Sequence, residues 1–555
     1  MDQKPNKQKK AVLVGIAGSY NAFSLSLYNL KAYAYEDPEI RRIWDISVIQ
    51  HPLINVTKHA DAVPRLADRI VQQAPHLIGF SCYMWNVNVF RDLAHMLRQR
   101  LPESKIVWGG PEIATDYLSQ GNYDNLDADF CVSGEGELTF LELLRNLTSE
   151  APALTSIPGL SYRKHGARTF TINAKRIPFK SLREVPSPFL TGVVDDEVLL
   201  RRKVQANLET QRGCNLRCSY CIYHKDMDRI SYSDVSRTID EVAYVINKGI
   251  KDIRFVDANF SSDLDHAKAV MRELIRRRFE TKLMFELIPG FIDEELATLF
   301  AQFNSLYDWN EVVLGIGVQT INLDVLRKIR RAIKADKFEY TFDLLQKYNV
   351  YAKIDLIIGM PGEDILSIER TLEYMLEKLR GSRAHLLCCH VMRGLPGTEL
   401  LEIAKEYGMV FSSKYEPHEL VESPALPREH MLQCLRRTAV VFRLINHRGW
   451  ACKEFISGKS SGDTCIRDAF FAARDRLGIS HVGVVDLPVE GLITYLQDRN
   501  SWFAQADFPY AETWWWNFAS VEVSDDWLID FLTKLGLPQN SPNFIAGSAA
   551  LTRQL

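Results

Sequence analysis

The sequence predicts an α/β fold in three parts: a doubly wound parallel sheet, a partial barrel of strand–helix units, and a mostly helical C-terminal region. Two observations carry this prediction. Short apolar runs alternate with amphipathic stretches of helical length from about residue 11 to about residue 400, as parallel sheets with helical crossovers require. Glycines and polar residues follow these runs rather than interrupt them. The boundaries are expected at 1–150, 201–420 and 421–555, with a proline-rich linker at 151–200.

The first part alternates strands and helices in the Rossmann-like manner. Strands are expected at Ala11–Ala17, Ile46–Gln50, Leu77–Cys82, Lys105–Trp108 and Phe130–Ser133. Helices are expected at Phe23–Tyr35, Ala62–Gln73, Val89–Arg100 and up to about Asn146. Ligands of such sheets bind at the carboxyl ends of the strands. Glycines fall there, either as ordinary tight turns or as places where a ligand approaches the backbone: Gly15, Gly18, Gly109, Gly110, Gly134 and Gly136. Gly15-Ile16-Ala17-Gly18 is not the dinucleotide fingerprint.

The second part has six strand candidates at helix-sized intervals: Val204–Thr210, Asp252–Asp257, Lys282–Leu287, Val312–Gln319, Ala352–Gly359 and His385–Met392. Helical patterns such as Ser233–Asn247 and His266–Arg277 separate them. Six such units predict a partial, TIM-like (β/α)6 barrel with its chemistry at the C-terminal ends of the strands.

Cys214, Cys218 and Cys221 follow the first of these strands with the spacing C-x3-C-x2-C, and Tyr220 precedes the third cysteine. Three thiolates can hold three irons of a [4Fe–4S] cluster and leave the fourth iron open to a ligand. A structural zinc site with His224 as fourth ligand is the alternative, and spacing alone leaves both open.

Composition limits the remaining classes. The 555 residues are 46% hydrophobic and 25% charged, with a net charge of −3, which is typical of soluble proteins and lacks the basic footprint of a nucleic-acid partner. No apolar run reaches the roughly twenty residues that span a bilayer. The polar, lysine-rich start favours a cytoplasmic location, where the ten cysteines serve metals or catalysis rather than disulfides.

The cysteine loop and the strand ends behind it together resemble the radical SAM superfamily. The matching segments are Phe255–Phe260, Glu286, Gly317–Thr320, Gly359–Glu363 and Arg393–Thr398. The resemblance implies that Cys214, Cys218 and Cys221 are the catalytic ligands of a [4Fe–4S] cluster, and it removes most of the zinc interpretation. It implies S-adenosylmethionine (SAM) binding by Tyr220, Asp257, Asn259, Glu286, Gln319, Arg330, Gly359 and Glu363. Taken singly, Asp257 and Glu286 also fit exposed strand-end charges, and Gln319 a satisfied polar residue.

The first part resembles the cobalamin-binding domain that precedes many radical SAM cores, through Gly79-Phe80-Ser81, Trp108–Glu112 and Ser133–Glu137. The implied cobalamin-binding residues are Gly15, Ser19, Ser81, Tyr83, Trp85, Gly109, Gly110, Glu112, Gly134, Glu135 and Gly136. Gly15–Ala22 lacks the histidine of the D-x-H-x-x-G type, so the resemblance implies cobalamin without a histidine lower ligand. Tyr83, Met84 and Trp85 are expected either near its lower face or packed on the sheet.

The joint resemblance implies a cobalamin-dependent radical SAM enzyme, most often a methyltransferase that acts on an unactivated carbon through a 5′-deoxyadenosyl radical and methylcobalamin. It also implies a small-molecule or peptide substrate and an external electron donor of the flavodoxin or ferredoxin type. Cyclisation or ring rearrangement, and non-catalytic corrinoid or SAM binding, stay open as alternatives. A tRNA methylthiotransferase needs a second cluster from three N-terminal cysteines, and only Cys82 and Cys131 precede the core.

The C-terminal region predicts helices at His430–Asn446 and Asp463–Leu477. The aromatic-rich stretch Arg499–Val523 is expected either as a substrate lid or as a packed core. Cys388 and Cys389 should point to opposite faces of the sixth strand, as a hydrogen donor or sulfur ligand or as core thiols. Cys434, Cys452 and Cys465 are too far apart to predict a second cluster.

Overall fold

The structure is a computed structural model of the chain. It describes residues 8–17, 23–52, 61–149, 152–164, 166–194, 205–223, 225, 227, 229–331, 333–379, 385–412, 418–431, 433–434 and 438. The chain forms two compact units. The first comprises Met1–Leu287, Phe291–Val313 and Leu395–Leu401, and the second comprises Ile288–Gly290, Leu314–Gly394 and Glu402–Leu555. Ser19, His224, Cys452, Cys465, the helix Asp463–Leu477, the stretch Arg499–Val523 and most of His430–Asn446 lie outside the described residues.

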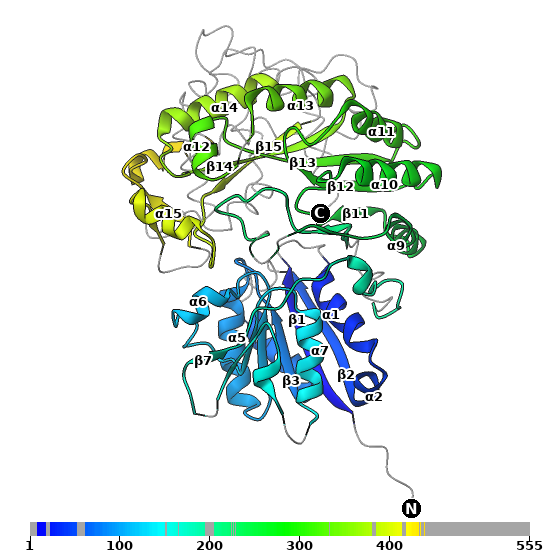
Figure 1. Cartoon of the computed structure of the whole chain (residues 1–555), viewed down its shortest axis with the longest axis vertical. Coiled ribbons are helices and arrows are strands. Elements are labelled where there is room, and N and C mark those ends of the chain that lie inside the picture. Colours follow the sequence, from blue (N-terminus) through cyan, green and yellow to red (C-terminus); the bar gives the residue numbers. More distant parts are fainter. Residues whose placement is uncertain are drawn as a thin grey trace, which may run out of the picture. The chain divides into compact units, whose positions relative to one another are not determined.

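The first unit begins with a seven-stranded sheet in the order β2-β1-β3-β4-β5-β6-β7 (Figure 1). Its parallel strands are β1 (Lys9–Ala17), β2 (Trp44–Pro52), β3 (Leu77–Ser81), β4 (Lys105–Gly109) and β5 (Phe130–Val132). β6 (Leu160–Arg163) and β7 (Phe170–Ile172) continue it in antiparallel pairing. β6 and the edge strand β7 come from the segment expected to be linker, so part of that segment belongs to the sheet.

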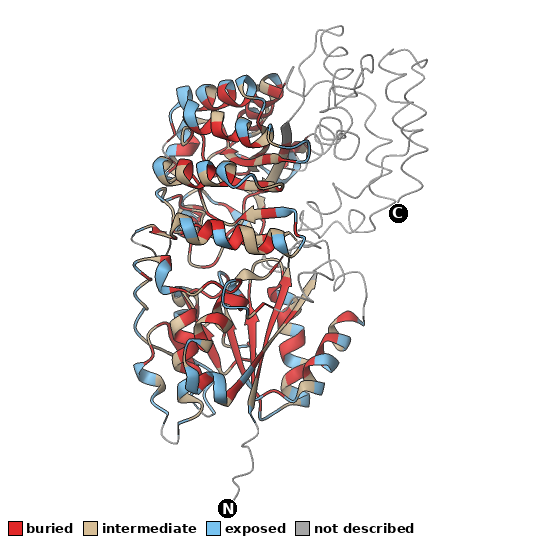
Figure 2. Cartoon of the chain, turned by 90° about the vertical axis from the view of Figure 1, so that its right-hand side faces the viewer, coloured by how far each residue is buried: buried red, intermediate tan, exposed pale blue. Residues whose placement is uncertain are grey.

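Helices cover both faces of this sheet. They are α1 (Leu25–Tyr35), α2 (Pro38–Ile43), α4 (Ala62–Gln73), α5 (Val87–Arg100), α6 (Thr115–Ser119) and α7 (Glu137–Asn146). After Lys9 and Lys10, strand β1 is apolar from Ala11 onward because alternate residues enter two different cores: Val12 and Val14 pack with α4 and α5, whereas Ala11 and Leu13 pack with α1 and α7. Figure 2 shows the buried residues concentrated on the strands and the inner helix faces. The predicted doubly wound sheet is confirmed, while α2 and α6 were not predicted.

The first unit continues with three parallel strands, β8 (Ala206–Leu208), β11 (Asp252–Phe255) and β12 (Lys282–Leu287). Helices α9 (Val235–Asn247), α10 (Leu264–Arg276) and α11 (Glu294–Asn304) follow in turn. Between β8 and α9, β9 (Gln211–Arg212) pairs antiparallel with β10 (Ser231–Tyr232) and closes the loop that carries the three cysteines. Two short 3-10 helices, η1 (Leu154–Ser156) and η2 (Leu182–Glu184), lie in the segment before this sheet.

The second unit holds the later strands: β13 (Glu311–Gln319, from Leu314 onward), β14 (Tyr351–Ile358) and β15 (His385–Val391), the last two parallel. Its helices are α12 (Leu323–Lys328), α13 (Ala335–Lys347), α14 (Ile365–Leu379) and most of α15 (Leu400–Glu406), with a small hairpin of β16 (Val410–Phe411) and β17 (Leu420–Glu422). The six predicted strand–helix units therefore occur in the predicted order. No helix among the described residues is long and apolar enough to cross a membrane.

Candidate active site

The cysteine loop leaves β9 through a glycine that no other residue can replace without strain. Gly213 has φ +97°, and a Cβ there would lie 2.7 Å from the carbonyl oxygen of Arg229. The Leu216 N–H donates to Cys214 Sγ at 3.4 Å, and the Cys221 N–H donates to the Cys218 carbonyl at 3.0 Å. Cys218 is buried and the other two thiols are half-buried. The loop therefore presents three thiols, with one backbone donor already directed at a sulfur.

This donor set fits a [4Fe–4S] cluster. None of the three cysteines is in a disulfide. Among the described residues, no group of three or more His, Cys, Asp or Glu side chains surrounds a single point as one metal ion would need. A [4Fe–4S] cluster takes one thiolate for each of three irons and leaves the fourth iron open, and three thiols on one loop can supply that set. His224, the fourth ligand of the zinc alternative, lies outside the described residues.

Buried polar atoms beside the loop are unsatisfied, as a ligand site would leave them. Ser219 Oγ and Gln211 Oε1 have no hydrogen-bond partner among the described residues. Gln211 Nε2 donates to the Asn259 carbonyl at 2.7 Å, and the Tyr223 hydroxyl donates to the Val256 carbonyl at 3.5 Å. These bonds bring the half-buried Tyr220 and its loop to the end of β11, where the predicted SAM residues Asp257 and Asn259 lie.

Asp257 itself is held by its own chain. Its carboxylate accepts the Thr210 N–H at 2.8 Å, the Thr210 hydroxyl at 2.6 Å and the Gln211 N–H at 3.0 Å. Burial outweighs these bonds and raises the pKa of Asp257 to about 7. The side chain thus braces the turn that leads into the cysteine loop.

Glu286 is more open. It lies at the end of β12, where its carboxylate accepts from Arg254 at 2.7 Å while its carbonyl accepts the Phe260 N–H at 2.9 Å. Both partners of the ion pair are partly exposed, at 41% for Arg254 and 28% for Glu286. Of the predicted SAM carboxylates in the first unit, Glu286 is therefore the one that a ligand reaches most easily.

In the second unit, the strand ends again hold predicted SAM residues. Glu363 is buried and accepts the N–H groups of Gly359 and Met360 at 3.2 and 3.3 Å and the Thr320 hydroxyl at 3.0 Å. Burial raises its pKa to about 7. Gly359 has φ +86°, and a Cβ there would collide with Leu420 on β17. Glu363 and Gly359 therefore shape the loop after β14.

Gln319 ends β13 with a left-handed φ of +69°, and its Oε1 is buried without a partner among the described residues. Two arginines follow α12, and the predicted Arg330 is the more exposed of them. Arg330 is exposed, whereas the buried Arg331 donates to the Gly317 carbonyl. Sequence reasoning missed Arg331 because two adjacent arginines give no signal of which one turns inward.

Glycines at the strand ends of the first sheet leave the backbone without side chains. A Cβ on Gly110, which has φ +103°, would lie 2.6 Å from the Cys82 carbonyl oxygen, and one on Gly15 would lie 2.6 Å from Ser24 Oγ. Gly134, with φ +78°, instead faces open space. Gly109 and Gly136 have looser contacts, at 3.6 and 3.2 Å. These glycines, called the glycine cradle below, let the chain pack closely on itself at Gly15 and Gly110 and leave open space at Gly134.

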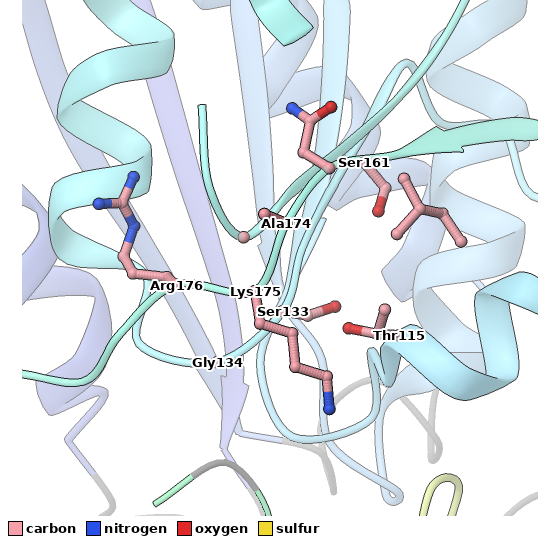
Figure 3. Close-up of a pocket in the computed structure, with 10 residues that line it drawn as sticks. Thr115, Ser133, Gly134, Ser161, Ala174, Lys175 and Arg176 are labelled. Atoms are coloured by element: carbon pink, nitrogen blue, oxygen red, sulfur yellow. The ribbon is translucent and has the colours of Figure 1, made fainter. Parts of the chain in front are cut away.

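A small cleft of about 10 Å³, open to solvent, adjoins Gly134. Figure 3 shows Ser133, Thr115 and Lys175 around it. Ser133 Oγ is buried and has no partner among the described residues. A cleft of this size holds about one water molecule, so the cobalamin site at these residues stays a prediction.

The other predicted cobalamin residues divide into two groups. Tyr83 and Trp85 stack with ring centroids 4.4 Å apart, and Trp85 Nε1 donates to the Ile16 carbonyl at 3.0 Å at the end of β1. Ser81 Oγ lies 3.3 Å from Ser26 Oγ, and Glu112 is buried beside Tyr123, whose hydroxyl donates to its carbonyl. The first pair thus lies at the strand ends, whereas Glu112 packs into the fold.

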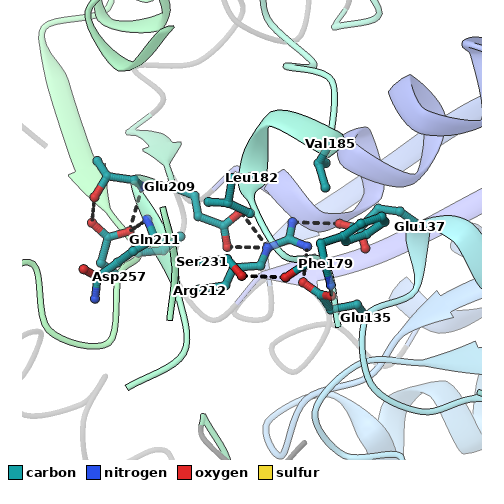
Figure 4. A network of polar contacts seen from close by, with 12 residues as sticks. Glu135, Glu137, Phe179, Leu182, Val185, Glu209, Gln211, Arg212, Ser231 and Asp257 are labelled. Carbon is teal, nitrogen blue, oxygen red and sulfur yellow. Dashed lines mark hydrogen bonds and ion pairs between the residues drawn. The ribbon is translucent and has the colours of Figure 1, made fainter. Parts of the chain in front are cut away.

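Glu135 belongs to a polar network that the sequence did not predict (Figure 4). Arg212 donates to Glu135 at 2.9 Å, to Glu137 at 2.7 Å and to Glu209 at 3.0 Å. Burial raises the pKa of Glu135 and Glu209, and although burial opposes it, the three carboxylates raise the pKa of Arg212. The only sequence signal was the placement of charges directly beside the cysteine motif and the glycines.

The other described cysteines differ in burial. Cys82 and Cys131 are fully buried at β3 and β5, and burial raises the pKa of the Cys131 thiol to about 12. Burial also raises the pKa of Cys389 well above its usual value. Low-pKa, exposed thiols are the reactive ones, so Cys82 and Cys131 fit core thiols, whereas the half-buried Cys388 and Cys389 keep both of their interpretations.

Comparison with known proteins agrees with these features. The chain matches the B12 binding domain model over residues 44–144 and the radical SAM superfamily model over residues 208–375. It is 29% identical over 389 residues to the cobalamin-dependent radical SAM methyltransferase TokK of Streptomyces tokunonensis, covering 67% of this chain and 54% of that protein. It is also 29% identical to the 2-(S-pantetheinyl)-carbapenam-3-carboxylate methyltransferase of Streptantibioticus cattleyicolor, covering 63% and 50%. The chain thus spans about half the length of these curated relatives.

Two solved structures share the fold. The radical SAM methyltransferase TsrM of Kitasatospora setae has a TM-score of 0.57 at 19% identity, covering 73% of this chain and 78% of that one. The cobalamin-dependent SAM radical enzyme OxsB has a TM-score of 0.61 at 13% identity, covering 98% and 80%. The two matching domains imply the predicted [4Fe–4S] cluster, SAM and cobalamin. The chain therefore resembles the cobalamin-dependent radical SAM enzymes, with a match to a B12-binding domain followed by a match to a radical SAM domain.

Proposed function

We propose that this protein is a methyltransferase that uses SAM cleavage and cobalamin to methylate an unactivated carbon of a small molecule or peptide. The observation that supports it best is the joining of the cysteine loop and the glycine cradle in one compact unit, through the contacts of Arg212. A carbon radical and a methyl donor must meet at one substrate, which requires neighbouring cofactor sites.

Specific residues would hold each group. Cys214, Cys218 and Cys221 would ligate the cluster, and Ser219, Gln211, Asn259 and Glu286 offer polar atoms to SAM beside it. Gly15, Gly110, Gly134 and Ser133 would hold the corrinoid. When bound, the cluster with SAM supplies a 5′-deoxyadenosyl radical and cobalamin a methyl carrier. The protein contributes orientation and exclusion of water.

The second unit provides charged groups for a polar substrate. On β14, residues 351, 353, 355 and 357 are half-buried while their alternate neighbours are buried. Asp355 Oδ1 lies 3.3 Å from Lys353 Nζ and 3.2 Å from His390 Nε2 on β15, and despite burial these two neighbours lower the pKa of Asp355. A charged strand face of this kind suits polar substrate groups. An external flavodoxin or ferredoxin as electron donor, a cytoplasmic location, and a C-terminal domain that begins near residue 421 as a possible lid belong to the same proposal.

The proposal is tested by anaerobic reconstitution followed by turnover with labelled SAM against small molecules and peptides. Wild-type protein should show iron–sulfur and corrinoid absorbance, and S-adenosylhomocysteine and methylated product should form beside 5′-deoxyadenosine. Product without methylation would indicate cyclisation or rearrangement, and cofactor binding without SAM cleavage a sensor. Protein that binds iron and SAM but refuses cobalamin would contradict the proposal.

The cluster assignment has its own test. Cys218→Ala should abolish 5′-deoxyadenosine formation, because one iron loses its ligand, and should leave corrinoid binding largely intact. Cys131→Ala, which removes a buried thiol elsewhere in the same unit, is the matched control and should keep SAM cleavage. A Cys218→Ala protein that cleaves SAM at the normal rate refutes the assignment.

A further inference from the structure

Arg212 holds two loops of the first unit at once. It is the last residue of β9, two positions before Cys214. Two of its partners flank Gly136: Glu135 lies in the loop between β5 and α7, and Glu137 is the first residue of α7. The third partner, Glu209, precedes β9. One guanidinium therefore joins the start of the cysteine loop to the loop that carries Gly134 and Gly136.

The geometry of the contact is specific to arginine. Nη1 donates to Glu135, Nη2 to Glu137 and Nε to Glu209, so each nitrogen serves a different carboxylate. The planar guanidinium fixes the directions of these bonds, whereas a lysine ammonium would retain the charge without the directions. The side chains of Glu135 and Glu137 are only 6% exposed and that of Arg212 is 10% exposed, so solvent screens these ion pairs little.

A second chain of bonds supports the same junction. The Phe179 N–H donates to Glu135 Oε2 at 2.6 Å, and the Ser231 hydroxyl on β10 donates to the Phe179 carbonyl at 2.6 Å. β10 pairs with β9 and closes the cysteine loop. Both ends of that loop are thus tied to Glu135, one directly through Arg212 and the other through Phe179.

We propose that Arg212 is a positioning residue that sets the distance and orientation between the cysteine loop and the cobalamin-binding loop at Gly134–Glu137. The inference rests on the proposed function, because it takes the three cysteines as cluster ligands and the glycine loop as part of the cobalamin site. Its role is geometric: the substrate carbon radical formed beside the cluster and the methyl donor must meet at one atom, and a shift of about 1 Å can cost about a hundredfold in rate.

The test measures that geometry without a substrate. Cluster-loaded protein is given hydroxocobalamin and reduced to cob(II)alamin and the paramagnetic cluster. The dipolar coupling between the two spins, read by low-temperature EPR, reports their distance and its spread. Arg212→Gln, Arg212→Lys and Glu137→Gln are compared with wild type. Arg237→Gln is the matched control, since Arg237 is also a half-buried arginine of this unit, bonded to Glu241 at 3.1 Å and to the Leu182 carbonyl at 2.6 Å.

Wild type and Arg237→Gln should give one narrow coupling. Arg212→Gln and Arg212→Lys should give a broadened or displaced coupling. Hydroxocobalamin should bind about tenfold more weakly, the size expected when the loop at Gly134–Glu137 loses a charge-assisted hydrogen bond from Arg212. An unchanged coupling in Arg212→Gln overturns the inference. If that variant does not fold, an unchanged coupling in both Arg212→Lys and Glu137→Gln overturns it. Wild-type protein that takes up no cobalamin or no cluster contradicts the proposed function instead.

Discussion

The strand ends of the two sheets carry different residues with different roles. In the B12-binding sheet, glycines at the ends of β1, β4 and β5 remove side chains where the backbone comes close to other groups or to open space. At the strand ends of the radical SAM core, polar side chains occupy the corresponding places, and most of them bond to their own loops. A strand-end glycine therefore indicates a position where a side chain would collide with the chain or enter open space. A strand-end carboxylate indicates first of all a loop that it holds by hydrogen bonds.

Asp257 and Glu363 show this best because they belong to different units and act alike. Each is buried, each accepts two backbone N–H groups and one threonine hydroxyl, and each has its pKa raised by burial to about 7. Glu286, in contrast, is partly exposed and paired only with Arg254 among its described side-chain contacts. Predicted SAM ligands that share a strand end thus differ in how available they are.

Replacing Gly110 should have the largest effect. Gly110→Ala puts a Cβ 2.6 Å from the Cys82 carbonyl oxygen at φ +103°, and we expect a loss of about 2–4 kcal/mol in unfolding free energy with loss of cobalamin binding. The matched control is Gly249→Ala, which has φ +82° but open space, and it should cost about 1 kcal/mol and bind cobalamin normally. Urea unfolding and corrinoid absorbance measure both. Equal effects of the two variants would contradict the claim that space, not backbone freedom, matters at Gly110.

Asp257 should make stability depend on pH. Its pKa is raised from 3.8 to about 7 in the folded protein, so its contribution is full below about pH 4 and is lost as pH rises through about 7. The unfolding free energy of wild type, measured through its urea midpoint, should therefore decrease by at most a few kcal/mol as the pH rises from 5 to 8. Asp257→Asn should flatten this dependence, and Glu363→Gln should remove a second part of it. A midpoint that rises with pH in wild type but not in Asp257→Asn would show that the carboxylate is folded in its charged form.

Glu286→Gln should change stability least, by under about 1 kcal/mol, because its ion pair with Arg254 is partly exposed. If Glu286 is available to a ligand, the same substitution should weaken SAM binding to the cluster-loaded protein, measured by equilibrium dialysis with labelled SAM. Arg254→Gln is the control that removes the pair and keeps the carboxylate. Normal SAM binding in Glu286→Gln would show that Glu286, like Asp257 and Glu363, holds its own loop rather than a ligand.

Much of the fold followed from local pattern. The period of the apolar runs predicted β1, β3, β4 and β5 and the six barrel strands within a few residues, because burial on both faces leaves an uninterrupted apolar stretch. The short elements α2, α6, β9 and β10 were missed. Elements of two to six residues carry too few positions for a period to show.

The sequence by itself determined which strand end each functional residue occupies, since chain order and periodicity place Asp257, Glu286 and the glycines without reference to distant residues. Only the tertiary structure decided what each side chain meets. It turned Arg331 rather than Arg330 inward, and it bonded Glu135 to Arg212 across 77 positions of sequence. The physical reason is that the direction of a side chain at a loop depends on φ and ψ values and on neighbours brought in by folding, neither of which spacing along the chain encodes.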